Sequence, residues 1–278
     1  AMQIKNSFQH KDMEATRSGW FECSCCPTNL ARLIPSIPGY MYAQKEDNLY
    51  INLFINSNVD LSIRNKQLQI IQQNNYPWDG ALVFIINPKT AAAFNLLVRI
   101  PGWAQNKAIP SGLYRFQNNS ASKPIIKVNG QAFEYTIVNG YATINRTWKR
   151  NDKVEVTLPM EVRRVVASEK IKDDIGKIAL QRGPLMYCAE WPDNNGKTSN
   201  IIIPANAAFT TEFKPGLLNG VTILKTEVPA FVINSNESIS TVQQSFTAIP
   251  YYSWANRGKG EMMVWFPEAV KDIDVMAK

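Results

Sequence analysis

The feature that most constrains the fold of this chain is a run of short segments in which apolar and polar side chains alternate. The clearest example spans residues 48–57, where apolar residues recur at every second position: Leu49, Ile51, Leu53 and Ile55. A period of two places these side chains on one face of a β-strand. Further strand-like runs occur at 68–72, 82–86, 94–100, 125–128, 141–144 and 154–158. Proline and Asn-Gly turns separate them, which favours a β-sandwich.

A second group of strand-like runs follows residue 161. These runs lie at 162–167, 177–181, 185–189, 201–203, 221–224, 230–233, 244–248 and 261–266. The length of 278 residues suits two domains, so we expect a boundary near residues 159–162. Periodicity alone also allows one larger sandwich.

A dense cysteine segment precedes the first strands. Residues 20–37, WFECSCCPTNLARLIPSI, contain three of the four cysteines, Cys23, Cys25 and Cys26. Pro27 suits the first position of a helix, and the apolar residues after it follow helical spacing: Leu30, Leu33, Ile34 and Ile37. Cys25 and Cys26 are therefore expected at or just before a helix N-terminus. The unpaired N–H groups and the helix dipole favour a thiolate there.

Three interpretations of these thiols remain open. Thiolates bind soft metal ions and act as nucleophiles, but free cysteines are also common as small buried apolar residues. A disulfide between Cys25 and Cys26 is a third and strained alternative. A tetrahedral metal site needs more ligands than this chain offers, since it has no second CxxC motif and a single histidine, His10. His10 is either a surface histidine or a group that contacts substrate.

Composition excludes two classes of function. Hydrophobic residues make up 45% of the chain and charged residues 19%, as in globular proteins. The formal charge of +7 comes from scattered Lys and Arg residues without a recognition motif, so no nucleic acid is expected as partner. The longest apolar run, ALVFII from Ala81, is too short to cross a membrane. No signal peptide is visible, and the compartment stays open.

Aromatic residues offer a second set of candidates. Exposed Trp and Tyr rings stack on the C–H faces of sugars, although buried rings are equally natural. Trp103 and Trp148 lie in stretches that suit a core. The segment IPYYSWANRG at 249–258 mixes aromatic and polar residues in an expected loop: Tyr251, Tyr252, Trp254, Asn256 and Arg257. It either contacts sugar or braces a domain interface.

The cysteine segment also carries a family resemblance. CSCCPTNLARLIPSIPGYMYA, from Cys23, resembles the end of the catalytic domain of glycoside hydrolase family 127, the β-L-arabinofuranosidase family. Other stretches agree in the family's order: NLLVRIPGWA from Asn95, IKVNGQ from Ile126, GYATINRTWKRNDKVEVTLPMEVRRV from Gly140, GKIALQRGPLMYCAE from Gly176 and FTAIPYYSWANRGKGEMMVWFPEA from Phe246. The resemblance covers nearly the whole chain.

The resemblance implies a mainly β fold of two β-sandwich domains, at 46–160 and 161–278. A short helical segment, 1–45, precedes them as the tail of an (α/α)6-barrel catalytic domain. The family's pattern makes Cys25 the zinc-bound nucleophile and Cys26 a second zinc ligand, and gives Cys23 no ligand role. The family's other zinc ligands, a glutamate and a cysteine, and its acid/base glutamate fall upstream of this sequence.

The resemblance thus predicts the C-terminal part of a retaining glycoside hydrolase that acts on an arabinofuranoside or related glycan. Alone, this chain would be inactive. Leu30, Leu33 and Ile34 would lack their usual cover, so they should be exposed, disordered or covered by another chain, and self-association through residues 20–37 would follow. The alternative is a non-catalytic β-sandwich protein that binds carbohydrate or serves as a scaffold.

Overall fold

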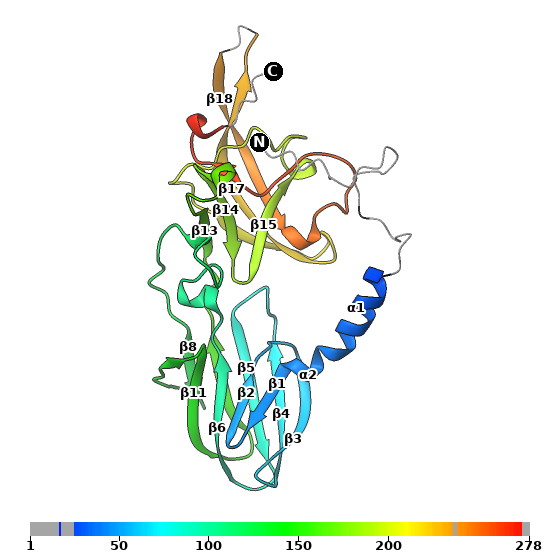
Figure 1. Ribbon diagram of the computed structural model, residues 1–278, viewed down its shortest axis with the longest axis vertical. Coiled ribbons are helices and arrows are strands. Elements are labelled where there is room, and N and C mark those ends of the chain that lie inside the picture. Colours follow the sequence, from blue (N-terminus) through cyan, green and yellow to red (C-terminus); the bar gives the residue numbers. More distant parts are fainter. Residues whose placement is uncertain (1–16, 18–24, 236–237, 274–278) are drawn as a thin grey trace. The chain divides into compact units, whose positions relative to one another are not determined.

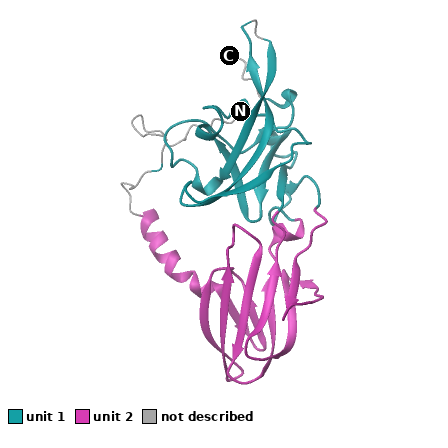
Figure 2. Cartoon of the chain, turned by 180° about the vertical axis from the view of Figure 1, so that it is seen from behind, with its two compact units in different colours: residues 1–19, 107–119, 161–278 teal, residues 20–106, 120–160 magenta. Residues whose placement is uncertain are grey.

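The computed structural model describes residues 17, 25–235 and 238–273 (Figure 1). It confirms a mainly β fold, organised in two compact units (Figure 2). Unit 1 contains Arg17, residues 107–119 and the chain from residue 161 on. Unit 2 contains the described chain from Cys25 to residue 106 and residues 120–160. His10 and Cys23 lie outside the described residues.

Unit 2 is built from two sheets in the part of the chain that the structure describes. The first has the order β1 (Tyr42–Lys45), β2 (Asn48–Ile51), β6 (Ala92–Arg99), β11 (Tyr141–Trp148) and β10 (Ile137–Val138). The second has the order β3 (Ser57–Ile63), β4 (Lys66–Asn74), β5 (Ala81–Pro88), β12 (Asp152–Thr157), β8 (Ile125–Val128) and β9 (Gln131–Ala132). The β2–β6 pair is parallel, and the other neighbours are antiparallel.

The inward faces of both sheets of unit 2 form one core, which makes this unit a sandwich. The core includes Leu96 and Ile144 from the first sheet and Ile70 and Phe84 from the second, all fully buried. Trp148 is buried as well, and its Nε1 donates a hydrogen bond to the Phe94 carbonyl oxygen over 3.0 Å. Trp148 is therefore a core residue and not a sugar contact.

Unit 1 is sandwich-like and forms a continuous path of paired strands. Their order is β16 (Thr210–Lys214), β17 (Val221–Ile233), β18 (Ile239–Pro250), β15 (Leu185–Glu190), β14 (Lys177–Arg182), β13 (Val162–Ala167) and β7 (Tyr114–Phe116). Two short strands, β19 (Met262–Met263) and β20 (Phe266–Pro267), pair with β15 and β14. The buried rings of Phe246 and Phe266, 5.4 Å apart between centroids, lie in the core that these strands enclose.

Strand β7 reaches unit 1 from the middle of the sequence of unit 2. Residues 107–119 follow the short helix η1 (Gly102–Gln105) and precede β8, both of which belong to unit 2. Phe116 of β7 pairs with Val165 of β13, and the Arg163 guanidinium lies 4.0 Å from the centre of the Phe116 ring. The strand that pairs with the edge of β13 therefore comes from residues 46–160, the range expected for the first β-sandwich domain.

Most predicted strands are present, with changed ends. β8 and β13 have the predicted bounds, whereas the run at 48–57 stops at Ile51 and β3 begins at Ser57. The runs at 221–224 and 230–233 are one strand, β17, which continues through Pro229. That proline is tolerated because β16 pairs with β17 only as far as Lys225. The run at 201–203 makes a single bridge, from Ile201 to Ala230.

Two helices precede the strands, α1 (Cys25–Ser36) and α2 (Pro38–Met41). Pro27 is the third described residue of α1, and not the first as expected. The first turn tolerates it because its N–H groups have no partner within the helix. Among the described residues, no helix has the length and apolar character needed to cross a membrane. That α1 is the tail of a helical barrel stays a prediction.

Candidate functional site

The described part of the cysteine segment places two thiols together at the start of α1. Cys25 and Cys26 are both exposed and free of disulfides, and their Sγ atoms lie 3.7 Å apart, within reach of a weak hydrogen bond. A disulfide requires a separation of about 2.05 Å, so the strained disulfide is not formed. Both sulfurs are therefore available as ligands or nucleophiles.

The spacing of the two sulfurs fits a zinc ion. Two thiolates bound at about 2.3 Å in a tetrahedral arrangement lie about 3.8 Å apart. The observed 3.7 Å between the Cys25 and Cys26 Sγ atoms matches this geometry. Residues 17, 25–235 and 238–273 offer no cluster of three or more His, Cys, Asp or Glu side chains. Among the described residues, the two thiols could therefore supply two donors to a metal ion.

The apolar face of α1 is exposed, as expected from the sequence. Leu30 is 56% exposed, Leu33 53% and Ile34 61%. These side chains are the ones that helical spacing places on a single face. No other described part of the chain covers Leu30, Leu33 or Ile34.

The fourth cysteine is unsuited to catalysis. Cys188, in β15, is fully buried. Burial raises the pKa of its thiol, and the nearby Glu190 carboxylate raises it further. Cys188 is therefore a protonated core residue, whereas Cys25 and Cys26 are exposed.

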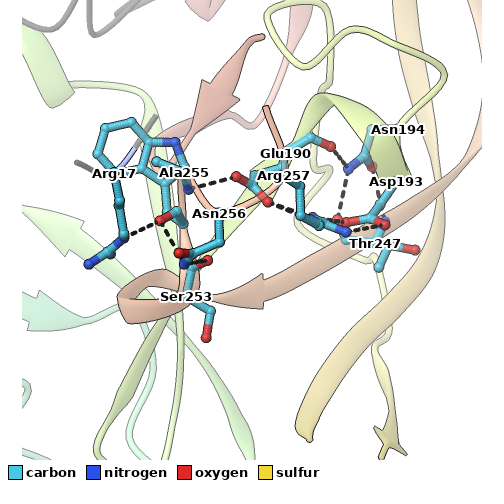
Figure 3. Close-up of polar contacts among 10 residues, drawn as sticks. Arg17, Glu190, Asp193, Asn194, Thr247, Ser253, Ala255, Asn256 and Arg257 are labelled. Atoms are coloured by element: carbon cyan, nitrogen blue, oxygen red, sulfur yellow. Dashed lines mark hydrogen bonds and ion pairs between the residues drawn. The ribbon is translucent and has the colours of Figure 1, made fainter. Parts of the chain in front are cut away.

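The segment at 251–257 forms a loop held by Arg257, which pairs with the buried Glu190 and the partly buried Asp193 (Figure 3). It follows β18 and begins with the short helix η4 (Tyr251–Ser253). Arg257 donates to Glu190 Oε2 from Nε over 3.0 Å and from Nη2 over 2.5 Å. It also donates to both carboxylate oxygens of Asp193, over 2.9 and 2.5 Å. The guanidinium therefore joins two carboxylates, with bidentate geometry at Asp193 and two donors on one oxygen of Glu190.

The Glu190 carboxylate is 3% exposed, so its charge depends on these partners. Its second oxygen, Oε1, accepts a hydrogen bond from the Ala255 N–H over 2.9 Å. Burial alone lowers the pKa of Arg257, but its hydrogen bonds with Asp193 and Glu190 outweigh burial and raise that pKa. Arg257 thus fixes the loop to β15, and its contact with sugar or an interface stays a prediction.

The Asn194 side chain hydrogen-bonds both the end of β15 and strand β18. Its side-chain Nδ2 donates to the Glu190 and Thr247 carbonyl oxygens over 2.8 and 2.9 Å. Its Oδ1 accepts from the Thr247 N–H over 3.0 Å. The Asn194 side chain is nearly inaccessible, at 1% exposure, so β15 and β18 are joined here by a buried amide.

Arg17 binds the outer side of the loop (Figure 3). Its Nε donates to the Trp254 carbonyl oxygen over 2.6 Å, and its Nη2 to the Tyr252 carbonyl oxygen over 2.7 Å. Its backbone N–H donates to the Ala255 carbonyl oxygen over 3.1 Å. Sequence reasoning missed this role, because no local pattern marks an arginine in a polar lead-in for pairing with carbonyl groups far along the chain.

The aromatic side chains of the loop are partly open to solvent. Tyr251 is 41% exposed and Tyr252 is 52% exposed. The rings of Tyr251 and Trp254 are stacked, with centroids 6.1 Å apart and an interplanar angle of 8°. Trp103, in unit 2, packs partly buried against the core. Sugar contact at the loop stays a prediction.

Comparison with known sequences identifies both β units. A model described as the glycoside hydrolase family 127 middle domain of β-L-arabinofuranosidase matches residues 48–160. A model of the family 127 C-terminal domain matches residues 162–267. A curated relative, the non-reducing end β-L-arabinofuranosidase of Bifidobacterium longum subsp. longum, is 31% identical over 269 residues. That alignment covers 90% of this chain and 38% of the relative.

Solved structures show the same relationship. A structure titled as a GH127 β-arabinofuranosidase is 38% identical with a TM-score of 0.89, over 93% of this chain and 40% of that one. A GH127 β-L-arabinofuranosidase from Geobacillus stearothermophilus T6 is 35% identical with a TM-score of 0.82, over 96% and 41%. The chain thus spans about two fifths of the length of the relatives it matches.

Proposed function

The chain belongs to glycoside hydrolase family 127, and on that basis we propose that it is the C-terminal part of a retaining glycosidase whose nucleophile is Cys25. One observation carries the proposal: two exposed thiols lie 3.7 Å apart at the start of α1, directly before the family's β domains. The relatives' names indicate the substrate class, a β-L-arabinofuranoside cleaved at its non-reducing end. A glycan with this terminal sugar is the proposed partner.

Cys25 and Cys26 are the residues that would hold zinc. When bound, zinc would keep both sulfurs ionised and oriented at neutral pH. The two sulfurs already have the required spacing, so binding needs little rearrangement of the start of α1. The remaining ligands, and the acid/base glutamate, are proposed to lie in the upstream part of the enzyme.

The Cys25 thiolate performs the covalent chemistry in this proposal. Its Sγ attacks the anomeric carbon, a C–S bond forms, and the glycosidic C–O bond breaks while an acid protonates the leaving oxygen. Water then forms a C–O bond at the same carbon and gives a proton to the conjugate base of that acid, while the C–S bond breaks and the sulfur leaves as thiolate. Two inversions give net retention.

The first test compares the whole enzyme with the isolated chain. We expect the whole enzyme to hydrolyse an aryl β-L-arabinofuranoside, with β-L-arabinofuranose as the first product by NMR. Elemental analysis should find one zinc per whole enzyme, and much less than one per isolated chain, because the described residues supply two donors. The isolated chain should show no hydrolysis.

Two results would contradict this proposal. An inverted first product would exclude a covalent intermediate on Cys25. A whole enzyme that binds arabinofuranosides without cleaving them would favour the alternative, a non-catalytic carbohydrate-binding or scaffold protein.

A further prediction concerns the exposed face of α1. We expect the isolated chain to self-associate through Leu30, Leu33 and Ile34, because burying each side chain contributes about 1.5–3 kcal/mol. Leu33→Glu should raise the concentration for half-association at least about tenfold, since charge would enter the buried face. Sedimentation velocity over a range of concentrations measures it. The control is Ile125→Glu, because Ile125 is exposed to the same 53% on a strand of unit 2. Equal effects of the two variants would contradict the prediction.

A further inference from the structure

We propose that the outward face of the first sheet of unit 2, built on β2, β6 and β11, binds a glycan chain (Figure 1). The centre of this amide face is formed by Asn48, Tyr50, Asn95, Tyr141 and Asn145. The proposal rests on the function proposed above in one respect, the choice of glycan, which is a chain of arabinofuranose units.

A row of three asparagines crosses three neighbouring strands. The strand register places Asn95 of β6 between Asn48 of β2 and Asn145 of β11. Asn145 Nδ2 donates to Asn95 Oδ1 over 2.5 Å, and Asn95 Nδ2 donates to Asn48 Oδ1 over 2.8 Å. Among the described residues, Asn48 Nδ2 and Asn145 Oδ1 make no further hydrogen bond. The row spans about 9.6 Å, two strand spacings, and offers a ligand a donor at one end and an acceptor at the other.

The row departs from what these strands otherwise prefer. Their inward face carries Leu49, Leu96 and Ile144, which lie in register with one another and are buried. Asparagine is depleted in β-strands, in contrast to the β-branched and aromatic residues. Three asparagines in register on adjacent strands therefore go against local preference, and such departures are expected at functional sites.

Two tyrosines lie beside the asparagine row on the same face. Tyr50 of β2 and Tyr141 of β11 form an edge-to-face pair, with ring centroids 5.2 Å apart and an interplanar angle of 83°. Tyr141 Oη also donates a hydrogen bond to Asn52 Oδ1 over 2.7 Å. Both tyrosines are partly open to solvent. Because their partners already fix the rings, a sugar whose C–H groups contact them would cost little side-chain entropy.

The charges on the amide face favour a neutral ligand. None of the residues that the strand register places on this face is an aspartate or a glutamate, and the cations are Lys45 and Arg99. Two cations are few for a nucleic acid, whose binding depends on neutralising many phosphates. Sugar hydroxyls both donate and accept hydrogen bonds, as the amide groups of the row do. The face therefore fits a neutral, hydroxyl-rich chain.

The test measures binding of a linear L-arabinofuranose oligosaccharide to the 278-residue chain by isothermal titration calorimetry. Asn95→Ala should weaken binding at least about tenfold, because it removes the middle of the row and both of its hydrogen bonds. Asn145→Ala, at the exposed end, should weaken it about threefold. The control is Gln69→Ala, which removes a half-buried amide bonded to Asp60 on β4, in the other sheet of unit 2. It should stay within twofold of the wild type.

Three results would overturn the amide face as a glycan site. They are no binding by the wild-type chain, binding within twofold of the wild type by both Asn95→Ala and Asn145→Ala, and an equal loss in Gln69→Ala. Tighter binding of single-stranded DNA than of the oligosaccharide would also overturn it. Binding with the Asn95 effect, together with a whole enzyme that cleaves no arabinofuranoside, would refute the proposed function and support the site. Hydrolysis by the whole enzyme without binding by the chain would refute the site alone.

Discussion

Cys25→Ser is expected to lower kcat/KM of the whole enzyme for β-L-arabinofuranosides by at least about a thousandfold. A serine hydroxyl stays protonated at neutral pH, where a cysteine bound to zinc is a thiolate. It is also a poorer ligand for zinc. Because Cys25 is exposed at the start of α1, the change should leave the fold intact. Steady-state kinetics with an aryl glycoside gives the ratio, and circular dichroism checks the fold.

Two other cysteines provide the comparison. Cys188→Ala removes a buried, protonated thiol outside the site and should keep kcat/KM within about threefold. Cys26→Ser should primarily weaken zinc binding, and excess zinc should restore part of its activity. Retention of more than a tenth of wild-type kcat/KM by Cys25→Ser would remove Cys25 from the role of nucleophile.

Arg257→Met is expected to destabilise unit 1 by about 3–5 kcal/mol. Methionine fills much of the volume of arginine, but it leaves Glu190 buried and without the guanidinium that offsets its charge. Asp193 loses the same partner. Urea unfolding, followed by a probe specific to unit 1 such as hydrogen exchange in β15, measures the free energy of unfolding.

The matched control is Arg64→Met. Its ion pair with Asp47 is exposed, with 63% of the arginine side chain open to solvent, so it should contribute less than about 1 kcal/mol. Adding Glu190→Gln to Arg257→Met should recover part of the loss, because the buried charge is then gone. A cost below about 1 kcal/mol for Arg257→Met alone would mean that the Glu190 charge is not held by this pair.

The spacing of apolar residues along the sequence predicted several strands and the first helix. The strand-like runs at 125–128 and 162–167 correspond to β8 and β13 with their observed bounds. β8 alternates between exposed and buried residues, whereas β13 buries only Val165. The spacing of Leu30, Leu33 and Ile34 gave α1 and its single apolar face. The paired thiols of Cys25 and Cys26 were visible for the same reason, since neighbours in sequence are neighbours in space.

Long-range pairing was not predictable in this way. The three residues of β7 carry too little pattern to be recognised, and they form a strand because β13 offers an unpaired edge. Glu190 and Arg257 are 67 residues apart, and only the fold shows that they neutralise each other. The partners of Arg17 are backbone carbonyls, which every residue possesses and no sequence motif distinguishes.

Strand β7 also has a consequence for how such enzymes can be taken apart. The two family matches meet near residue 160, which invites cutting a gene there to exchange one module for another. A piece starting at residue 161 would lack β7 and bare the hydrogen-bonding edge of β13, a known route to aggregation. A module exchange that keeps unit 1 whole must therefore carry residues 107–119 along with residues 161–278.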